Sequence, residues 1–138
     1  MLRKGLNHAE AEKRISVVNS AFPDALVKNY ENLIPSLNLP DQNDRHVVAA
    51  AIKSNSNCIV TNNLKDFPQD ILGNFEIAVI SADDFLVDII DLNHEQAISA
   101  FKEMVLNRKN PRMDEYEVLN QLRKCGLKKT ADFLHSLI

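Results

Sequence analysis

Residues 39–68 read LPDQNDRHVVAAAIKSNSNCIVTNNLKDFP. A polar turn opens this stretch, an alanine-rich apolar segment follows, and a short β-branched run leads into a second polar cluster. Apolar residues at helical spacing predict a helix over residues 44–54, and residues 58–61 predict a strand. A helix followed by a strand and a polar loop is typical of a parallel α/β unit. Ligands of open α/β sheets bind beyond the carboxyl ends of the strands, so we expect a site there.

The rest of the chain divides into a part in which helices alternate with strands and a part that is helical throughout. In the first part we predict a helix over residues 8–21, short strands at 25–27 and 77–80, and single helical turns at 30–34 and 68–72. From residue 82 the pattern predicts four helices, the last three over about 94–106, 114–125 and 127–137. We therefore predict an α/β fold with a small, mainly parallel sheet in residues 1–91 and a helical C-terminal appendage in residues 92–138.

Three of these helices begin after residues that commonly cap helix N-termini. Asn7, Ser81 and Asn93 precede the helices that start near residues 8, 82 and 94. Asp84 occupies the capping-box position after Ser81, where Glu or Gln is usual. We therefore expect the side chains of Asn7, Ser81 and Asn93 to accept hydrogen bonds from backbone N–H groups.

Composition narrows the class of protein. The chain has 138 residues, 45% of them hydrophobic, as expected for one globular domain. With only 3 glycines the chain has no Gly-rich phosphate loop. Its net charge is −3, and the sequence shows no basic stripe of the kind that binds nucleic acid. Any RNA contact would depend on local Lys and Arg side chains and on bound metal.

Location and redox state are also suggested by the sequence. Cys58 and Cys125 are far apart and have no nearby cysteine partner, which favours free thiols over a disulfide. No apolar run approaches the roughly 20 residues that span a bilayer, and Met1 is followed by Leu-Arg-Lys-Gly instead of a signal segment. We expect a cytoplasmic protein without membrane contact.

Oxygen-bearing side chains gather at two points of the quoted stretch. Carboxylates and amides of this kind are suitable ligands for a hard cation such as Mg²⁺ and hence for phosphate chemistry. Each residue also has a simpler role open to it. Asp41 and Asp44 can cap the helix that they precede, Asp66 and Asn63 can form a turn or cap the next helix, and Thr61 can cap its own loop. Spacing alone does not decide between these roles.

Two motif blocks carry a family resemblance. The segment D-x-x-D-R-H-V-x-A-A-A at Asp41 to Ala51, with I-V-T-x-N-L-K-D-F-P at Ile59 to Pro68, resembles the second half of a PIN domain. S-A-D-D-F-L-V-D-I-I-D-L at Ser81 to Leu92 resembles a PIN subgroup with an additional helical C-terminal domain. PIN domains are Mg²⁺-dependent ribonucleases that include the VapC toxins of toxin–antitoxin pairs. The resemblance implies a partial PIN-like α/β/α fold from about His8 onward.

The resemblance also implies roles for four residues. Asp44 matches the third active-site carboxylate of the family, and Asp66 matches its fourth acidic position. Thr61 and Asn63 match polar residues that line the same site. By this correspondence Asp44 and Asp66 would hold Mg²⁺ or Mn²⁺, which activates water and stabilises charge on the scissile phosphate.

Two acidic positions of the family pattern have no counterpart in this sequence. The pattern begins with an apolar strand ending in D-x-N, and a second carboxylate, usually Glu, follows on an early helix. The resemblance is therefore to a PIN domain that lacks its N-terminal third. Because two carboxylates make a poor cage for Mg²⁺, we expect weak metal binding and little nuclease activity from the chain alone. The absent strand would leave a sheet edge open to another chain.

Three hypotheses follow for the biological role. The chain is part of a ribonuclease that acts on RNA once a complementing N-terminal fragment supplies the absent Asp and Glu. Alternatively, it is a non-catalytic PIN-like interaction module that pairs with a toxin, an antitoxin or a second copy of itself as a homodimer. The third hypothesis is a gene product with no selected activity.

Overall fold

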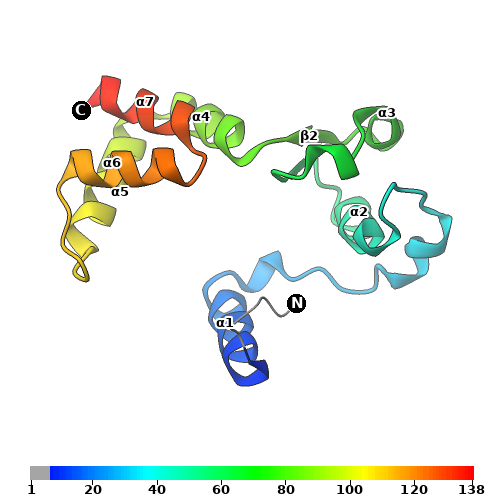
Figure 1. Cartoon of the computed structure of the whole chain (residues 1–138). Coiled ribbons are helices and arrows are strands. Elements are labelled where there is room, and N and C mark those ends of the chain that lie inside the picture. The colour runs from blue at the N-terminus through cyan, green and yellow to red at the C-terminus, as the bar shows by residue number, and fades with distance from the viewer. Residues whose placement is uncertain (1–6) are drawn as a thin grey trace. The chain divides into compact units, whose positions relative to one another are not determined.

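The computed structural model describes residues 7–138 (Figure 1). The chain forms two compact units, one ending at Ser56 and the other beginning at Asn57. Across residues 7–138, no helix has the length and apolar character needed to cross a membrane.

The first unit consists of two α-helices joined by short 3₁₀ helices. Its elements are α1 (His8–Ala21), η1 (Pro23–Ala25), η2 (Glu31–Ser36), η3 (Gln42–Asp44) and α2 (Arg45–Lys53). The predicted helix over residues 44–54 is therefore confirmed, with its first turn in the tighter 3₁₀ form. The apolar face of α2 buries Val48, Ala49 and Ala51.

The strand predicted at residues 25–27 is wrong. Pro23 starts a 3₁₀ turn instead, and the Ala25 N–H donates to the Phe22 carbonyl oxygen at 3.0 Å. Proline presets the backbone for such a turn and has no N–H for a sheet ladder. The turn predicted at residues 30–34 is the 3₁₀ helix η2, and it includes Pro35.

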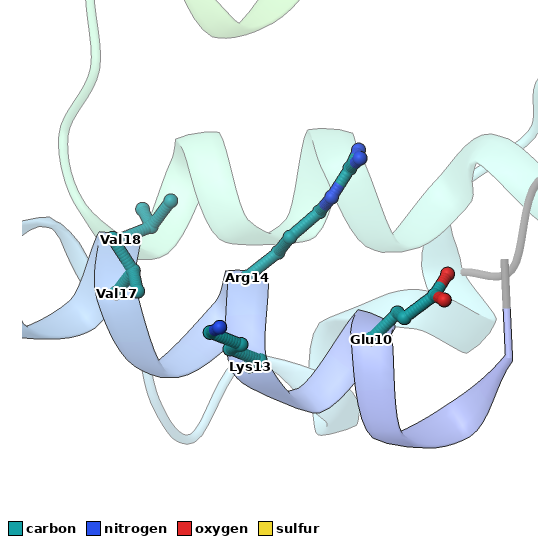
Figure 2. Close-up of a pocket in the computed structure, with 5 residues that line it drawn as sticks. All are labelled: Glu10, Lys13, Arg14, Val17 and Val18. Atoms are coloured by element: carbon teal, nitrogen blue, oxygen red, sulfur yellow. The ribbon is translucent and has the colours of Figure 1, made fainter.

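Helix α1 begins as predicted, because the Asn7 side chain accepts a hydrogen bond from the Glu10 N–H at 2.8 Å. Unlike α2, α1 has no buried residue. Figure 2 shows five of its side chains, which line a shallow hollow on the surface: Glu10, Lys13, Arg14, Val17 and Val18. Packing therefore contributes little to the stability of α1, and local capping contributes proportionately more.

The second unit begins with a two-stranded parallel sheet. Strand β1 (Cys58–Val60) pairs with β2 (Ala78–Ile80), and Ile59 lies opposite Val79. The crossover between the strands contains η4 (Leu64–Asp66), α3 (Gln69–Leu72) and η5 (Gly73–Phe75). Helix α3 contacts β2, and Phe67, Leu72 and Ile77 are buried. The predicted small parallel sheet is confirmed.

The two edges of this sheet differ. A side-chain amide covers the outer edge of β2, because Gln69 Oε1 accepts from the Val79 N–H and Gln69 Nε2 donates to the Ile77 carbonyl, both at 2.9 Å. Strand β1 has β2 as its single neighbouring strand in the part of the chain that the structure describes. Within the described residues, the sheet therefore has one edge bonded by a side-chain amide and one edge, that of β1, that pairs with no further strand.

Four helices complete the second unit: α4 (Ala82–Leu92), α5 (His94–Asn107), α6 (Glu115–Lys124) and α7 (Lys128–Leu137). The predicted caps are confirmed, since Ser81 accepts from the Asp84 N–H and Asn93 from the Gln96 N–H. One apolar core holds the helices together, and its buried members are Ile90, Phe101, Val118, Leu119, Ala131 and Leu134.

Helix α4 belongs to this bundle and contacts α7 (Figure 1). The predicted boundary between residues 91 and 92 therefore falls in the last turn of α4, just before Leu92, inside the bundle. As a division between the domains of a family, that boundary stays a prediction.

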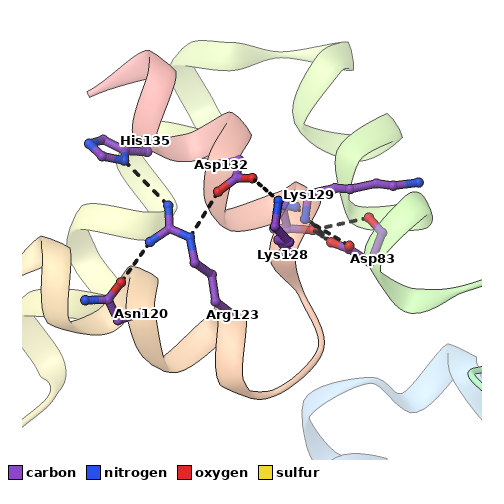
Figure 3. Close-up of polar contacts among 8 residues, drawn as sticks. Asp83, Asn120, Arg123, Lys128, Lys129, Asp132 and His135 are labelled. Atoms are coloured by element: carbon purple, nitrogen blue, oxygen red, sulfur yellow. Dashed lines mark hydrogen bonds and ion pairs between the residues drawn. The ribbon is translucent and has the colours of Figure 1, made fainter.

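Polar contacts join the surfaces of the bundle helices (Figure 3). Asp132 on α7 pairs with Arg123 of α6 at 3.0 Å and with Lys128 at 3.1 Å. Asp84 on α4 pairs with Lys129 of α7 at 2.9 Å. Apart from the half-buried Arg123, the members of these pairs are exposed to solvent, and such pairs contribute little to stability.

Candidate functional site

The acidic residues at the start of α2 have different surroundings. The Asp41 carboxylate accepts a hydrogen bond from the Asn43 N–H at 2.9 Å, so Asp41 caps η3, the 3₁₀ turn that leads into α2. Asp44 occupies the N-cap position of α2, but its side chain makes no capping bond within the described residues. The Asp44 carboxylate therefore remains available to another partner, half-buried at the positive end of a helix.

The loop that follows β1 brings three of the predicted site residues together. The Thr61 hydroxyl accepts from the Asn63 N–H at 3.0 Å, which confirms its loop-capping role. Asn63 Nδ2 in turn donates to Asp66 Oδ2 at 2.6 Å. Thr61, Asn63 and Asp66 thus form one hydrogen-bonded chain at the carboxyl end of β1.

Asp66 does not cap the helix that follows it. Helix α3 begins at Gln69, its N-cap residue is Pro68, and no side chain caps it. Asp66 instead ends the 3₁₀ helix η4, where its carboxylate is half-buried and oriented by Asn63. A carboxylate with one oxygen held by an amide and the other free can offer the free oxygen to a cation.

Asn62 has a role that the sequence did not suggest. Its Oδ1 accepts a hydrogen bond from the Ala82 N–H at 3.3 Å. Because Ala82 is the first residue of α4, this bond connects the loop after β1 to the start of the helical bundle. The polar cluster after the strand was the only sequence signal for this role, because Ala82, the partner of Asn62, lies 20 residues further along the chain.

The four predicted site residues are divided between the two units. Asp44 belongs to the unit that ends at Ser56, whereas Thr61, Asn63 and Asp66 belong to the unit that begins at Asn57. The structure therefore establishes the Thr61–Asn63–Asp66 group, and the participation of Asp44 stays a prediction. The group supplies oxygen donors, the type that Mg²⁺ and Mn²⁺ prefer, and no sulfur or imidazole ligand.

Comparison with known proteins identifies the family. Residues 82–136, which cover α4 to α7, match the family described as "VapC50 C-terminal domain". A protein of Mycobacterium tuberculosis (strain ATCC 25618 / H37Rv), named "Putative ribonuclease VapC50", is 34% identical over 111 residues. The chain belongs to the VapC-like PIN family. The predicted family and its subgroup with C-terminal helices are thereby confirmed.

The extent of this match is limited. The matched region covers 78% of this chain and 65% of the length of the mycobacterial relative. No solved structure matches this chain. The match alone therefore does not assign the activity, substrate or partners of a complete VapC-like protein to this chain.

Proposed function

We propose that this chain is the metal-binding and helical portion of a VapC-type ribonuclease, which cleaves RNA when an additional strand completes its site. The observation that carries the proposal is the Asn63–Asp66 pair at the carboxyl end of β1, with Thr61 beside it. The carboxyl end of a parallel strand is where α/β proteins bind their ligands, and a hydrogen-bonded carboxylate lies at that place in this chain.

Asp44 is the second carboxylate that we assign to the metal. In a parallel α/β unit the helix runs opposite to the strand that follows it, so the start of the helix and the end of the strand face the same side. Asp44 starts α2 and Asp66 follows β1, and only a short turn separates these two elements. The Asp44 carboxylate also makes no capping bond to α2, the helix that it precedes. Both observations support a shared ion.

The donor set fits Mg²⁺ or Mn²⁺ in kind and falls short in number. Bound there, a divalent ion would activate a water molecule and stabilise negative charge on the scissile phosphate. Asp44 and Asp66 would hold the ion, and Asn63 would keep Asp66 oriented through its 2.6 Å bond. Because Mg²⁺ prefers octahedral coordination with strong negative charge, two carboxylates predict weak binding by the chain alone.

The open edge of β1 supports an added strand as the source of the remaining carboxylates. The Thr61 N–H donates to Ile80 and the Asn57 carbonyl accepts from Ala78, so these two residues face β2. Since backbone groups alternate along a strand, those of Cys58 and Val60 point to the opposite, open edge. An apolar strand that ends in Asp-x-Asn would pair there and place its acid beside Asp66.

The same open edge favours a second candidate function. Without the additional carboxylates, the chain would act as a non-catalytic module whose β1 edge pairs with an antitoxin, a toxin or a second copy of the chain. Exposed edges attract such pairing in general. In either case the protein would act in the cytoplasm, where RNA and an antitoxin are both available.

Cleavage of single-stranded RNA with and without a complementing peptide tests the proposal. The full chain is incubated with Mn²⁺ or Mg²⁺ and a synthetic peptide of the form apolar strand–Asp-x-Asn. We expect metal-dependent cleavage that rises with peptide concentration and is lost in Asp44→Ala and Asp66→Ala. Asp24→Ala and Asp70→Ala, which remove exposed carboxylates elsewhere in each unit, should leave it unchanged.

Two outcomes would contradict the enzyme proposal. Equal cleavage by the wild type and by both site variants would identify a contaminating nuclease. Peptide binding without cleavage at any metal concentration would favour the non-catalytic module.

A further inference from the structure

A short basic loop joins α5 to α6 and lies at one end of the helical bundle (Figure 1). The name basic loop is used for residues 108–112 of this connection, which read RKNPR and hold three cations and no acid. The second unit as a whole contains more acidic than basic residues. The basic loop is therefore a local exception in a chain whose net charge is −3.

The cations of the basic loop are not neutralised by neighbours. Within the described residues, Arg108, Lys109 and Arg112 form no ion pair, whereas Arg123, Lys128 and Lys129 are all paired with aspartates. Two of the three acids that follow the basic loop bond to each other's backbone in the capping box of α6. Asp114 accepts from the Glu117 N–H at 2.8 Å, and Glu117 Oε1 accepts from the Asp114 N–H at 3.3 Å.

Arg108 of the basic loop has a hydrogen-bond donor that no described residue satisfies. Its side chain is half-buried, and its Nε is buried without a hydrogen-bond partner in the part of the chain that the structure describes. A buried donor without an acceptor is destabilising, and such groups in folded proteins usually have a partner. A guanidinium presents its N–H groups in a planar fork that matches the oxygens of a phosphate. Because the Nε itself is buried, a phosphate at the basic loop would contact the terminal nitrogens of the guanidinium.

We propose that the basic loop binds the phosphate backbone of RNA. The inference rests on the proposed function, because that function makes RNA the substrate, and it adds the surface on which the RNA is held. A chain with net negative charge does not attract a polyanion as a whole, so its contacts must come from an unneutralised local cluster. Phosphate contacts of this kind fix the position of RNA and carry no sequence information.

The test measures RNA binding and cleavage separately in the full chain. Binding of a fluorescent single-stranded RNA is followed by anisotropy in EDTA over a range of salt concentrations, so that no metal or cleavage is involved. The variant Lys109→Gln/Arg112→Gln changes two exposed residues and leaves the half-buried Arg108 in place. We expect its slope of log binding constant against log salt to fall by about 1.4, since each lost phosphate contact on a single strand contributes about 0.7.

A matched variant keeps the result specific to the basic loop. Lys28→Gln/Lys53→Gln removes the same charge from exposed positions in the first unit and should leave the slope unchanged. Equal effects from both variants, or no effect from the loop variant, would overturn the inference. An unchanged loop slope in a chain that cleaves RNA removes the loop and keeps the ribonuclease. Loop-dependent binding by a chain that does not cleave RNA would keep the basic loop as an RNA-binding surface and remove the ribonuclease proposal.

Discussion

Asp83 of α4 caps the first turn of α7 through Thr130. The Asp83 carboxylate accepts from the Thr130 hydroxyl at 2.7 Å and from the Thr130 N–H at 2.8 Å. The Lys129 N–H donates to its other oxygen at 3.0 Å (Figure 3). The residue before α7 is Leu127, whose side chain cannot accept a hydrogen bond. A carboxylate from another helix therefore satisfies the free N–H groups that every helix start presents.

We expect Asp83→Ala to destabilise the bundle by about 1–3 kcal/mol, because it removes charge-assisted bonds to a buried threonine and to a helix terminus. Urea unfolding of the full chain measures the change. Asp88→Ala on the same helix removes an exposed carboxylate and should change the free energy of unfolding by less than about 0.5 kcal/mol. Equal losses in the two variants would show that the Asp83 contact contributes nothing specific.

The same contact predicts a dependence of stability on pH. Burial raises the pKa of Asp83, but the hydrogen bonds from Thr130 and Lys129 outweigh it and hold the pKa below its usual 3.8. A lowered pKa favours the ionised form in the folded state, so the stabilisation is present above the unfolded pKa and is lost as pH falls below it. We expect the difference in stability between the wild type and Asp83→Asn to shrink as pH falls from about 5 to about 2. A difference that stays constant over this range would contradict the assignment.

Contacts within a few residues account for what the sequence predicts well. Asn7, Ser81 and Asn93 each bond to an N–H three residues ahead, so their type and position suffice to identify a cap. The Asp83–Thr130 contact spans 47 residues and depends on how two helices pack. Asp84 occupies the capping-box position in the sequence, whereas its carboxylate pairs with Lys129.

The site follows the same division. Thr61, Asn63 and Asp66 lie within six residues, and a single loop brings them together as the motif suggested. Asp44 precedes them by a helix and a strand, so its distance from Asp66 depends on the packing of whole elements. The Gln69 bonds to β2 were also beyond the sequence, because only the sheet register places Ile77 and Val79 beside that side chain.

Gln69 gives a prediction about self-association. Gln69→Leu removes both bonds to β2 and leaves the Val79 N–H and the Ile77 carbonyl without partners on an edge. We expect a loss of about 1–3 kcal/mol in the free energy of unfolding and concentration-dependent association, since unpaired edges attract other strands. Urea unfolding and analytical ultracentrifugation measure the two effects.

Gln96→Leu is the control for this experiment, because it makes the same chemical change at an exposed position of α5. The Gln96 side chain makes no hydrogen bond within the described residues. Association of the Gln96 variant to the same extent would attribute the effect to added surface hydrophobicity and not to the edge of β2.

Asn63 tests whether the loop after β1 holds a metal. Asn63→Ala removes the amide that orients the Asp66 carboxylate, and residues that orient a metal ligand typically contribute about 10-fold to affinity. We therefore expect about 10-fold weaker Mn²⁺ binding by isothermal titration calorimetry or electron paramagnetic resonance.

Asn63→Asp should have the opposite effect, because a further carboxylate beside Asp66 adds negative charge that the cation neutralises. Asn74→Ala, at an exposed position in η5, should leave Mn²⁺ affinity unchanged. Weaker binding by the Asn63→Asp variant, or equal binding by all four proteins, would place the ion away from Asp66.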